Sequence, residues 1–172
     1  ACTFFRAMGL ETGTSLVEVD RLAMARDLIA KAGDKLILPN GAVIAQRLEG
    51  GAPHRSVARD AIPVGWAMFD IDAATESEFG RRIAGAGTVL WNGPMGVFET
   101  PPFDHGTLAM ARALAAATAR GTITVVGGGD SAAAVAQAGL TGAMTHVSTG
   151  GGASLEFLEG KPLPGVVALD DA

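Results

Sequence analysis

Apolar residues fall into two patterns that alternate along the chain. Between Leu16 and Ala32 they recur at helical spacing, and Ser15 and Gly33 supply a start and a stop signal for a helix. Elsewhere they form short continuous runs, which are typical of buried strands. The predicted strands cover residues 35–39, 42–45, 66–71, 88–91, 123–126 and 144–147.

Helices are predicted between most of these strands. They cover residues 4–8, 75–84 with a capping box of Thr75 and Glu78, 104–121 with Asp104 as the cap, 131–138, and a last stretch through residue 158. Strands that alternate with helices indicate βαβ crossovers, and apolar strands indicate a sheet covered on both faces. We therefore expect one α/β domain with three layers and a doubly wound, mostly parallel, Rossmann-like sheet.

The composition fits a folded protein and narrows the classes of function. Of the 172 residues, 48% are hydrophobic and 18% are charged, a mixture that argues against disorder. The net charge of −5 is scattered and no basic stripe occurs, so no nucleic-acid partner is expected. No run reaches the ~20 apolar residues of a membrane span, and no charged leader precedes an apolar run. We expect a cytoplasmic protein without a membrane partner.

Few side chains are available for metal clusters or nucleophilic catalysis. Cys2 is the single cysteine, so neither an internal disulfide nor a multi-cysteine metal site is expected. His54, His105 and His146 have unrelated spacings, and no Gly-x-Ser-x-Gly elbow occurs. The chain begins at Ala1 without an initiator Met, which we interpret as a segment of a longer protein, although a processed chain would look the same.

Three predicted strands end in glycine-rich turns, where open α/β sheets bind their ligands. Gly127, Gly128 and Gly129 follow one strand, and Asp130 and Ser131 open the next helix. Bare backbone at a helix N-terminus suits phosphate oxygens, and Asp130 can hold Mg²⁺. The alternative is a tight turn with Asp130 or Ser131 as an N-cap. Neither the Walker A nor the dinucleotide-binding pattern is present.

The other two turns have the same ambiguity. Residues 148–154 place glycines and hydroxyls at another strand-to-helix junction, where close helix–sheet packing is the alternative. Two such turns are harder to explain by packing alone, because glycine costs stability. In the third turn, Asn92 can donate to a phosphate, Glu99 can accept from a ribose hydroxyl, and Pro94 and Val97 can wall a base. Taken separately, these are an ordinary turn and an ordinary surface charge.

Taken together, these segments resemble the phosphoglycerate kinase family. The resemblance runs along the whole chain and is carried by residues 13–16, 88–99, 127–134, 146–156 and 158–166. It implies the glycolytic, reversible phosphoryl transfer between 1,3-bisphosphoglycerate and Mg·ADP, which gives 3-phosphoglycerate and Mg·ATP. The family is usually monomeric, and its N-terminal lobe binds the phosphoglycerate.

By this resemblance, residues 1–172 are a partial C-terminal, nucleotide-binding domain that lacks at least one strand of the intact lobe. Leu16, Pro94 and Val97 would line the adenine slot, Glu99 would bind the ribose, and Asn92 would contact the phosphate chain. A methionine, Met68, replaces the glycine that usually packs on the adenine, which can reshape that slot.

The resemblance also assigns the phosphate end of the site. Asp130 would hold Mg²⁺, and Gly127 would contact the nucleotide. The amides of Gly128 and Gly129 and the hydroxyl of Ser131, which stands where many members carry Thr, would stabilise the transferred phosphoryl group. Gly151 and Gly152 would assist from the adjacent turn.

Two other hypotheses remain beside an intact phosphoglycerate kinase. The phosphoglycerate-binding lobe, with its catalytic Arg, and a nucleotide-contacting Lys of the family lie outside these 172 residues. The segment is therefore expected to be inactive alone, and a stand-alone, non-catalytic nucleotide-binding module is the alternative. A dinucleotide-binding dehydrogenase domain fits the predicted fold but not the motifs.

Overall fold

A computed structural model of the chain describes residues 1–169. The chain divides into two compact units, each built from two segments. Unit 1 contains residues 1–81 and 95–110, and unit 2 contains residues 82–94 and 111–172. The assignment of residues 1–172 to a single C-terminal domain stays a prediction.

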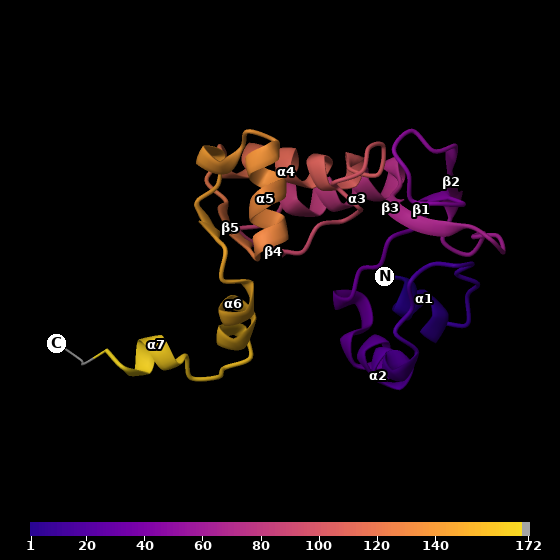
Figure 1. Ribbon diagram of the computed structural model, residues 1–172. Helices are drawn as coiled ribbons and strands as arrows, with labels where there is room; N and C mark the ends of the chain where they lie inside the picture. Colours follow the sequence, from indigo (N-terminus) through magenta and orange to yellow (C-terminus); the bar gives the residue numbers. More distant parts are fainter. Residues whose placement is uncertain (170–172) are drawn as a thin grey trace. The chain divides into compact units, whose positions relative to one another are not determined.

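Unit 1 is built around a three-stranded antiparallel sheet with the order β2-β1-β3 (Figure 1). Its elements are α1 (Cys2–Ala7), η1 (Val19–Arg21), α2 (Leu22–Ala32), η2 (Gly33–Lys35), β1 (Gly41–Ala45), β2 (His54–Ala58), β3 (Ala67–Ile71) and the first parts of α3 (Ala73–Ala84) and α4 (His105–Thr118). The pattern of strands and helices predicted β1 and β3 but neither β2 nor the antiparallel pairing.

β2 was missed because it lacks an apolar run. Its pairing with β1 extends from Gly41 opposite Ala58 to Ala45 opposite His54. Four of its five residues are exposed and Val57 is half-buried. An edge strand with one solvated face carries polar and charged side chains, which removes the signal that marks a buried strand.

Two apolar clusters contribute to the core of unit 1. The first contains Ala42, Ile44 and Ile62, with Val57, Trp66 and Met68 packed against it. The second contains Ala45, Ala52 and Phe103, with Val43, Phe69 and Val97 packed against it. The Phe69 and Phe103 rings lie 5.1 Å apart, and the Phe103 side chain is fully buried. The second cluster thus packs Val97, a predicted site residue, against the sheet.

The predicted helix from Leu16 to Ala32 begins later than expected. Its first turns are replaced by η1, and α2 starts only at Leu22. The Ser15 hydroxyl accepts a hydrogen bond from the Met68 N–H at 2.9 Å, so it serves β3 and not a helix N-terminus. Gly33 ends α2 as predicted, with φ +50°.

Two further predictions in unit 1 are wrong. The strand predicted at residues 35–39 does not form: Lys35 ends η2, and residues 36–39 pair with no strand in the described part of the chain. The helix predicted to begin at Thr75 begins at Ala73, and Asp72 caps it by accepting from the Thr75 N–H at 3.0 Å. Thr75 is then free to accept from the Asn40 N–H at 3.1 Å through its hydroxyl. The capping-box pattern was therefore coincidental.

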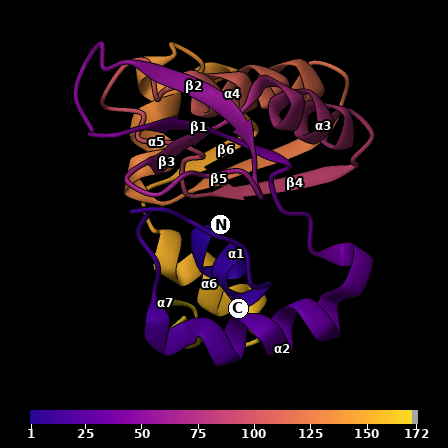
Figure 2. The same ribbon diagram turned by 90° about the vertical axis from the view of Figure 1, so that its right-hand side faces the viewer.

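Unit 2 contains the parallel sheet that the sequence predicted, with the order β4-β5-β6 (Figure 2). Its elements are the last parts of α3 and α4, β4 (Thr88–Asn92), β5 (Ile123–Gly127), α5 (Gly129–Gln137), η3 (Thr141–Ala143), β6 (His146–Ser148), α6 (Gly151–Leu158) and α7 (Pro164–Val167). The Rossmann-like α/β prediction is confirmed, and most boundaries differ from the predicted ones by one or two residues.

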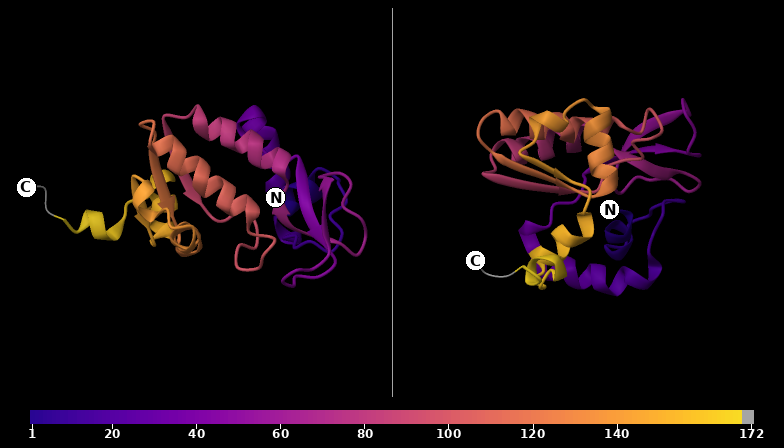
Figure 3. Two further views of the ribbon diagram at one scale, coloured as in Figure 1. Left: turned by 90° about the horizontal axis from the view of Figure 1, so that it is seen from above. Right: turned by 60° about the vertical axis from the view of Figure 1, so that its left-hand side comes forward.

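The two faces of the parallel sheet are covered unequally. Trp91 and Val126 pair in register and are buried, and α5 packs against β5 and β6 (Figure 3). Because side chains alternate along a strand, Leu90 and Val125 lie on the opposite face. There they line an open groove of about 460 Å³ together with residues of α6 such as Phe157.

A network of threonine hydroxyls joins the elements of unit 2. The Thr118 and Thr124 hydroxyl oxygens lie 2.6 Å apart, which links α4 to β5. Thr124 and Thr145 exchange two hydrogen bonds, each from the backbone N–H of one to the hydroxyl of the other, at 3.0 and 3.1 Å. These bonds extend the strand pairing beyond the start of β6. Along residues 1–169, no helix is both long and apolar enough to cross a membrane.

Candidate functional site

The three glycine-rich turns lie at one edge of the parallel sheet. Asn92, the last residue of β4, is in register with Gly127, the last residue of β5. Gly127 is in turn in register with Ser148, the last residue of β6. The carboxyl ends of all three strands are therefore level, and the turns that follow them are neighbours, at the usual place for a ligand in such a sheet.

Two of the turns touch through bare backbone. Gly128 precedes α5 with φ +99°, and its N–H donates to the Ser148 carbonyl at 3.1 Å. A Cβ atom on Gly151, the first residue of α6, would lie 2.7 Å from the Gly128 Cα and 3.0 Å from its nitrogen. No side chain fits at that point, so glycine at position 151 is a requirement of the structure.

Asn92 lies against both glycine turns. Its Nδ2 donates to the Gly151 carbonyl at 3.4 Å. A Cβ atom on Gly127 would lie 3.5 Å from the same nitrogen, and one on Gly128 would lie 3.5 Å from the Oδ1. The exposed Asn92 amide thus lies beside the main chain of both glycine turns.

Ser131 has a structural role in this arrangement. Its side chain is fully buried, and its oxygen accepts from the Gly93 N–H at 2.7 Å. This bond holds the turn after β4, which leads to the half-buried Pro94, against the first turn of α5. The predicted contact of the Ser131 hydroxyl with a phosphoryl group stays a prediction.

The first turn of α5 presents Gly129 and Asp130, both exposed. The first N–H groups of a helix have no partner within it and carry a partial positive charge, so they suit an anionic ligand. The exposed Gly152 occupies the equivalent region of α6. These groups are therefore candidates for contacts with phosphate oxygens.

The residues present also fit a magnesium ion held mainly by a ligand. Residues 1–169 contain no group of three or more His, Cys, Asp and Glu side chains that could hold a metal. Mg²⁺ in phosphate sites is typically bound by one or two carboxylates, with phosphate oxygens and water completing the shell. Asp130 supplies one such carboxylate beside the glycine turns.

The predicted base and ribose residues, Leu16, Val97 and Glu99, belong to unit 1. The segment before Leu16 is attached to β3, because the Thr14 N–H donates to the Trp66 carbonyl at 2.8 Å and Ser15 accepts from Met68. The Val97 N–H donates to the Phe69 carbonyl at 2.9 Å. Leu16 and Val97 are thus both tethered to the same strand, beside Met68, and Leu16 is 90% exposed.

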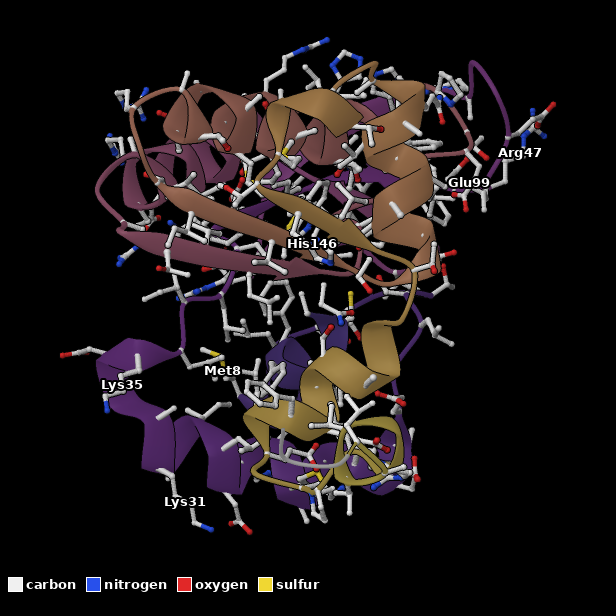
Figure 4. The ribbon with its side chains drawn as sticks, turned by 90° about the vertical axis from the view of Figure 1, so that its left-hand side faces the viewer. Met8, Lys31, Lys35, Arg47, Glu99 and His146 are labelled. Carbon is white, nitrogen blue, oxygen red and sulfur yellow. The ribbon has the colours of Figure 1, made fainter. Side chains whose placement is uncertain are left out.

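Glu99 lies at the surface of unit 1 (Figure 4). It follows Val97 in a tight turn in which the Thr100 N–H donates to the Val97 carbonyl at 3.0 Å. The Phe103 N–H then donates to the Thr100 carbonyl at 2.9 Å. The turn places the Glu99 carboxylate in solvent while it buries Phe103 in the core.

Two buried residues that hold this segment were missed by the sequence analysis. The Thr107 hydroxyl accepts from the N–H groups of Met95 and Gly96 at 3.1 and 3.3 Å. Asp70 accepts from the Gly106 N–H through its Oδ2 at 2.8 Å. An Asp within an apolar strand was the available signal for the second residue, but nothing local signalled Thr107.

Burial raises the pKa of Asp70 from 3.8 to about 6. The N–H groups of Gly106 and Ile71, and the nearby His105, oppose this effect, while the negative charge of Glu76 adds to it. The pKa of Glu76 is itself raised, mainly by burial. Asp70 therefore carries a charge at neutral pH that the fold accommodates at a cost.

Parallel strands, alternating helices and glycine turns at level strand ends define a Rossmann-like α/β protein whose strand ends form a candidate anion site. The family model described as phosphoglycerate kinase matches residues 1–161. The chain belongs to the phosphoglycerate kinase family, as its motifs predicted.

Known phosphoglycerate kinases are similar along nearly the whole chain. One from Chlorobium phaeovibrioides is 54% identical over 172 residues, which cover 98% of this chain and 43% of that protein. One from Picosynechococcus sp. is 51% identical over 170 residues, with 99% and 43% covered. The chloroplastic enzyme of Volvox carteri is 53% identical, with 98% and 37% covered.

Solved structures agree with this assignment. The phosphoglycerate kinase from Coxiella burnetii has a TM-score of 0.89 at 41% identity, with 96% of this chain and 43% of that chain covered. The enzyme from Pyrococcus horikoshii has a TM-score of 0.83 at 28% identity, with 98% and 42% covered. The chain therefore spans about two fifths of the length of most of these relatives.

Replacing Gly151 by Ala is expected to destabilise the protein by about 1–3 kcal/mol, because the added methyl group has to push the two turns apart. Gly152→Ala is the matched control, since a Cβ atom there has no neighbour within 4 Å. It is expected to be neutral or slightly stabilising. Urea unfolding followed by circular dichroism measures both, and equal stability of the two variants would refute the contact.

Asp70 is expected to make stability depend on pH. Its raised pKa means that the folded state binds the proton more tightly, so its stabilising contribution is complete below about pH 4 and is lost as pH rises through 6. Relative to Asp70→Asn, the wild type should therefore lose about 2 kcal/mol between pH 4 and pH 7. Denaturant unfolding at several pH values measures this difference, and exposed Asp60→Asn serves as control. A constant difference would contradict the expectation.

Proposed function

We propose that this chain is the ADP- and ATP-binding part of a phosphoglycerate kinase. The observation that carries the proposal is the contact of the Gly128 and Gly151 turns beside Asn92. The helices α5 and α6 both begin at that contact. Their first main-chain N–H groups therefore lie close together, beside the Asn92 side-chain amide. Such an edge suits the phosphate chain of a nucleotide.

The residues of unit 2 would bind and orient the phosphates. Asn92 and the amides of Gly128 and Gly129 would donate to phosphate oxygens, with Gly127 in contact and Gly151 and Gly152 assisting. When bound, Mg²⁺ would neutralise charge on the phosphates, and Asp130 would hold it. Phosphoryl transfer requires mostly positioning and charge stabilisation, which these groups supply.

The residues of unit 1 would recognise the rest of the nucleotide. Leu16 and Val97, both tethered to β3, would contact the adenine together with Pro94. Met68 would shape that slot from β3 itself. Glu99 would accept from the ribose hydroxyls through its exposed carboxylate.

The whole reaction would be the reversible transfer between 1,3-bisphosphoglycerate and Mg·ADP, with a carboxyl group as the acceptor in the reverse direction. Such a glycolytic enzyme would act as a monomer in the cytoplasm, with neither nucleic acid nor membrane as a partner. Because the chain spans 43% of its bacterial relatives, the non-catalytic nucleotide-binding module remains the second candidate.

A coupled assay separates catalysis from binding alone. We expect no ATP formation from 1,3-bisphosphoglycerate and Mg·ADP by the 172-residue chain, because the matched relatives extend well beyond it. ATP formation at the rate of a full-length phosphoglycerate kinase, run in parallel as the positive control, would contradict this expectation.

Asp130→Asn is expected to weaken the binding of Mg·ADP by about tenfold or more, because a metal-binding carboxylate is lost. The affinity for ADP in the presence of EDTA should change little. Isothermal titration calorimetry of both ligands measures this difference.

Asp34→Asn is the matched control, since it removes an exposed carboxylate from unit 1. If the wild type binds Mg·ADP and Asp130→Asn binds it equally well, the metal role of Asp130 is wrong. If the folded wild type binds no nucleotide, the proposed function is wrong.

A further inference from the structure

Residues 96–106 of unit 1 are folded around a single carboxylate. Asp70 lies near the end of β3, and its side chain is 1% exposed. A Cβ atom added to Gly96 or to Gly106 would lie 2.3 Å from the Asp70 Oδ1. The two glycines at the ends of the segment therefore lie directly against the carboxylate, which takes up the space that side chains at these positions would need.

Both oxygens of this carboxylate accept from the main chain. The Oδ1 accepts from the Ile71 N–H at 2.8 Å, and the Oδ2 accepts from the Gly106 N–H at 2.8 Å. Gly106 is in the first turn of α4, whose N–H groups attract negative charge. One carboxylate thus joins β3 to the C-terminal end of the segment.

The segment held in this way carries two residues of the proposed nucleotide site. Val97 is hydrogen-bonded to Phe69, which directly precedes Asp70, and Glu99 follows two residues later. Glu99 itself is exposed, so the position of its carboxylate depends on how firmly the turn beneath it is held. Asp70 and Thr107 hold the segment through hydrogen bonds from its main-chain N–H groups.

We propose that Asp70 is a positioning residue for ribose recognition, acting by fixing the segment that places Glu99. The inference rests on the proposed function, because it needs a nucleotide whose ribose Glu99 contacts. The protonation state of Asp70 matters here. The ionised carboxylate has an acceptor oxygen for each of the two N–H groups, whereas in the neutral acid one oxygen is a hydroxyl donor. Ribose recognition should therefore weaken when Asp70 is protonated.

A packing role alone does not account for a carboxylate at this position. Burying a charge is costly, and an apolar side chain would fill the same space without that cost. The charged groups that act on Asp70 are Glu76 on α3 and His105 at the start of α4, and Asp72 acts in turn on Glu76. Glu76 raises the pKa of Asp70 and His105 lowers it. The hydrogen bonds to the carboxylate come from the Ile71 and Gly106 N–H groups.

The test compares two ligands that differ only in the ribose hydroxyls. The affinity of the 172-residue chain is measured by calorimetry for Mg·ADP and for Mg·2′,3′-dideoxy-ADP, from pH 5.5 to pH 8. Protonation of the phosphates affects both ligands equally, so the ratio of the two affinities reports ribose recognition alone.

In the wild type, the preference for Mg·ADP is expected to be about tenfold at pH 8 and to fall as the pH is lowered through 6. In Asp70→Asn the ratio should be close to one and independent of pH. Asp72→Asn is the matched control, since it removes a nearby carboxylate that caps α3, and it should keep the wild-type ratio and profile. His105→Gln should keep a pH dependence, which excludes the histidine as its origin.

Each failure has a distinct signature. A folded Asp70→Asn variant that keeps the wild-type ratio overturns the inference and leaves the proposed function intact. If that variant does not fold, the wild-type series still decides, because a ratio that is constant through pH 6 also overturns the inference. A wild type that binds neither ligand overturns the proposed function and the inference together.

Discussion

The candidate site depends on one constraint, which is that three parallel strands end in register with one another. Asn92, Gly127 and Ser148 are in register, so the chain turns away from the sheet three times along one edge. The turns can approach each other as closely as Gly128 and Gly151 do because Gly151 has no side chain. The proposed anion site depends on this approach, since it brings main-chain N–H groups and two helix N-termini to the same edge.

In unit 1, hydrogen bonds to a buried carboxylate and a buried hydroxyl orient a surface segment. Its antiparallel sheet and its two apolar clusters form a small core, and the segment of residues 96–106 lies against that core through Phe103 and Val97. Apolar packing alone does not define how such a turn is oriented. Asp70 and Thr107 define it by hydrogen bonds to the main chain, and the buried charge lowers stability in exchange for a fixed geometry.

The sequence predicted most of unit 2 and less of unit 1. In unit 2, buried parallel strands with glycine turns have a strong local signature, and β4, β5 and β6 occur close to their predicted positions. In unit 1, the solvated strand β2 has no apolar run, and the hydroxyls of Ser15 and Thr75 bond to distant main-chain groups instead of capping helices. The helix-capping signals failed because each of these hydroxyls has a hydrogen-bond partner far away in the sequence.

By itself, the sequence determined the elements of the parallel sheet, the three glycine turns and the family, because each of these depends on contiguous residues. The contact of Gly128 with Gly151 and the tethering of both Leu16 and Val97 to β3 were decided by the tertiary structure. The same holds for Asp70, whose partner Gly106 is 36 residues away. The physical reason is that a hydrogen bond or a steric contact depends on distance in space, and local residue patterns do not encode which distant main-chain groups will meet.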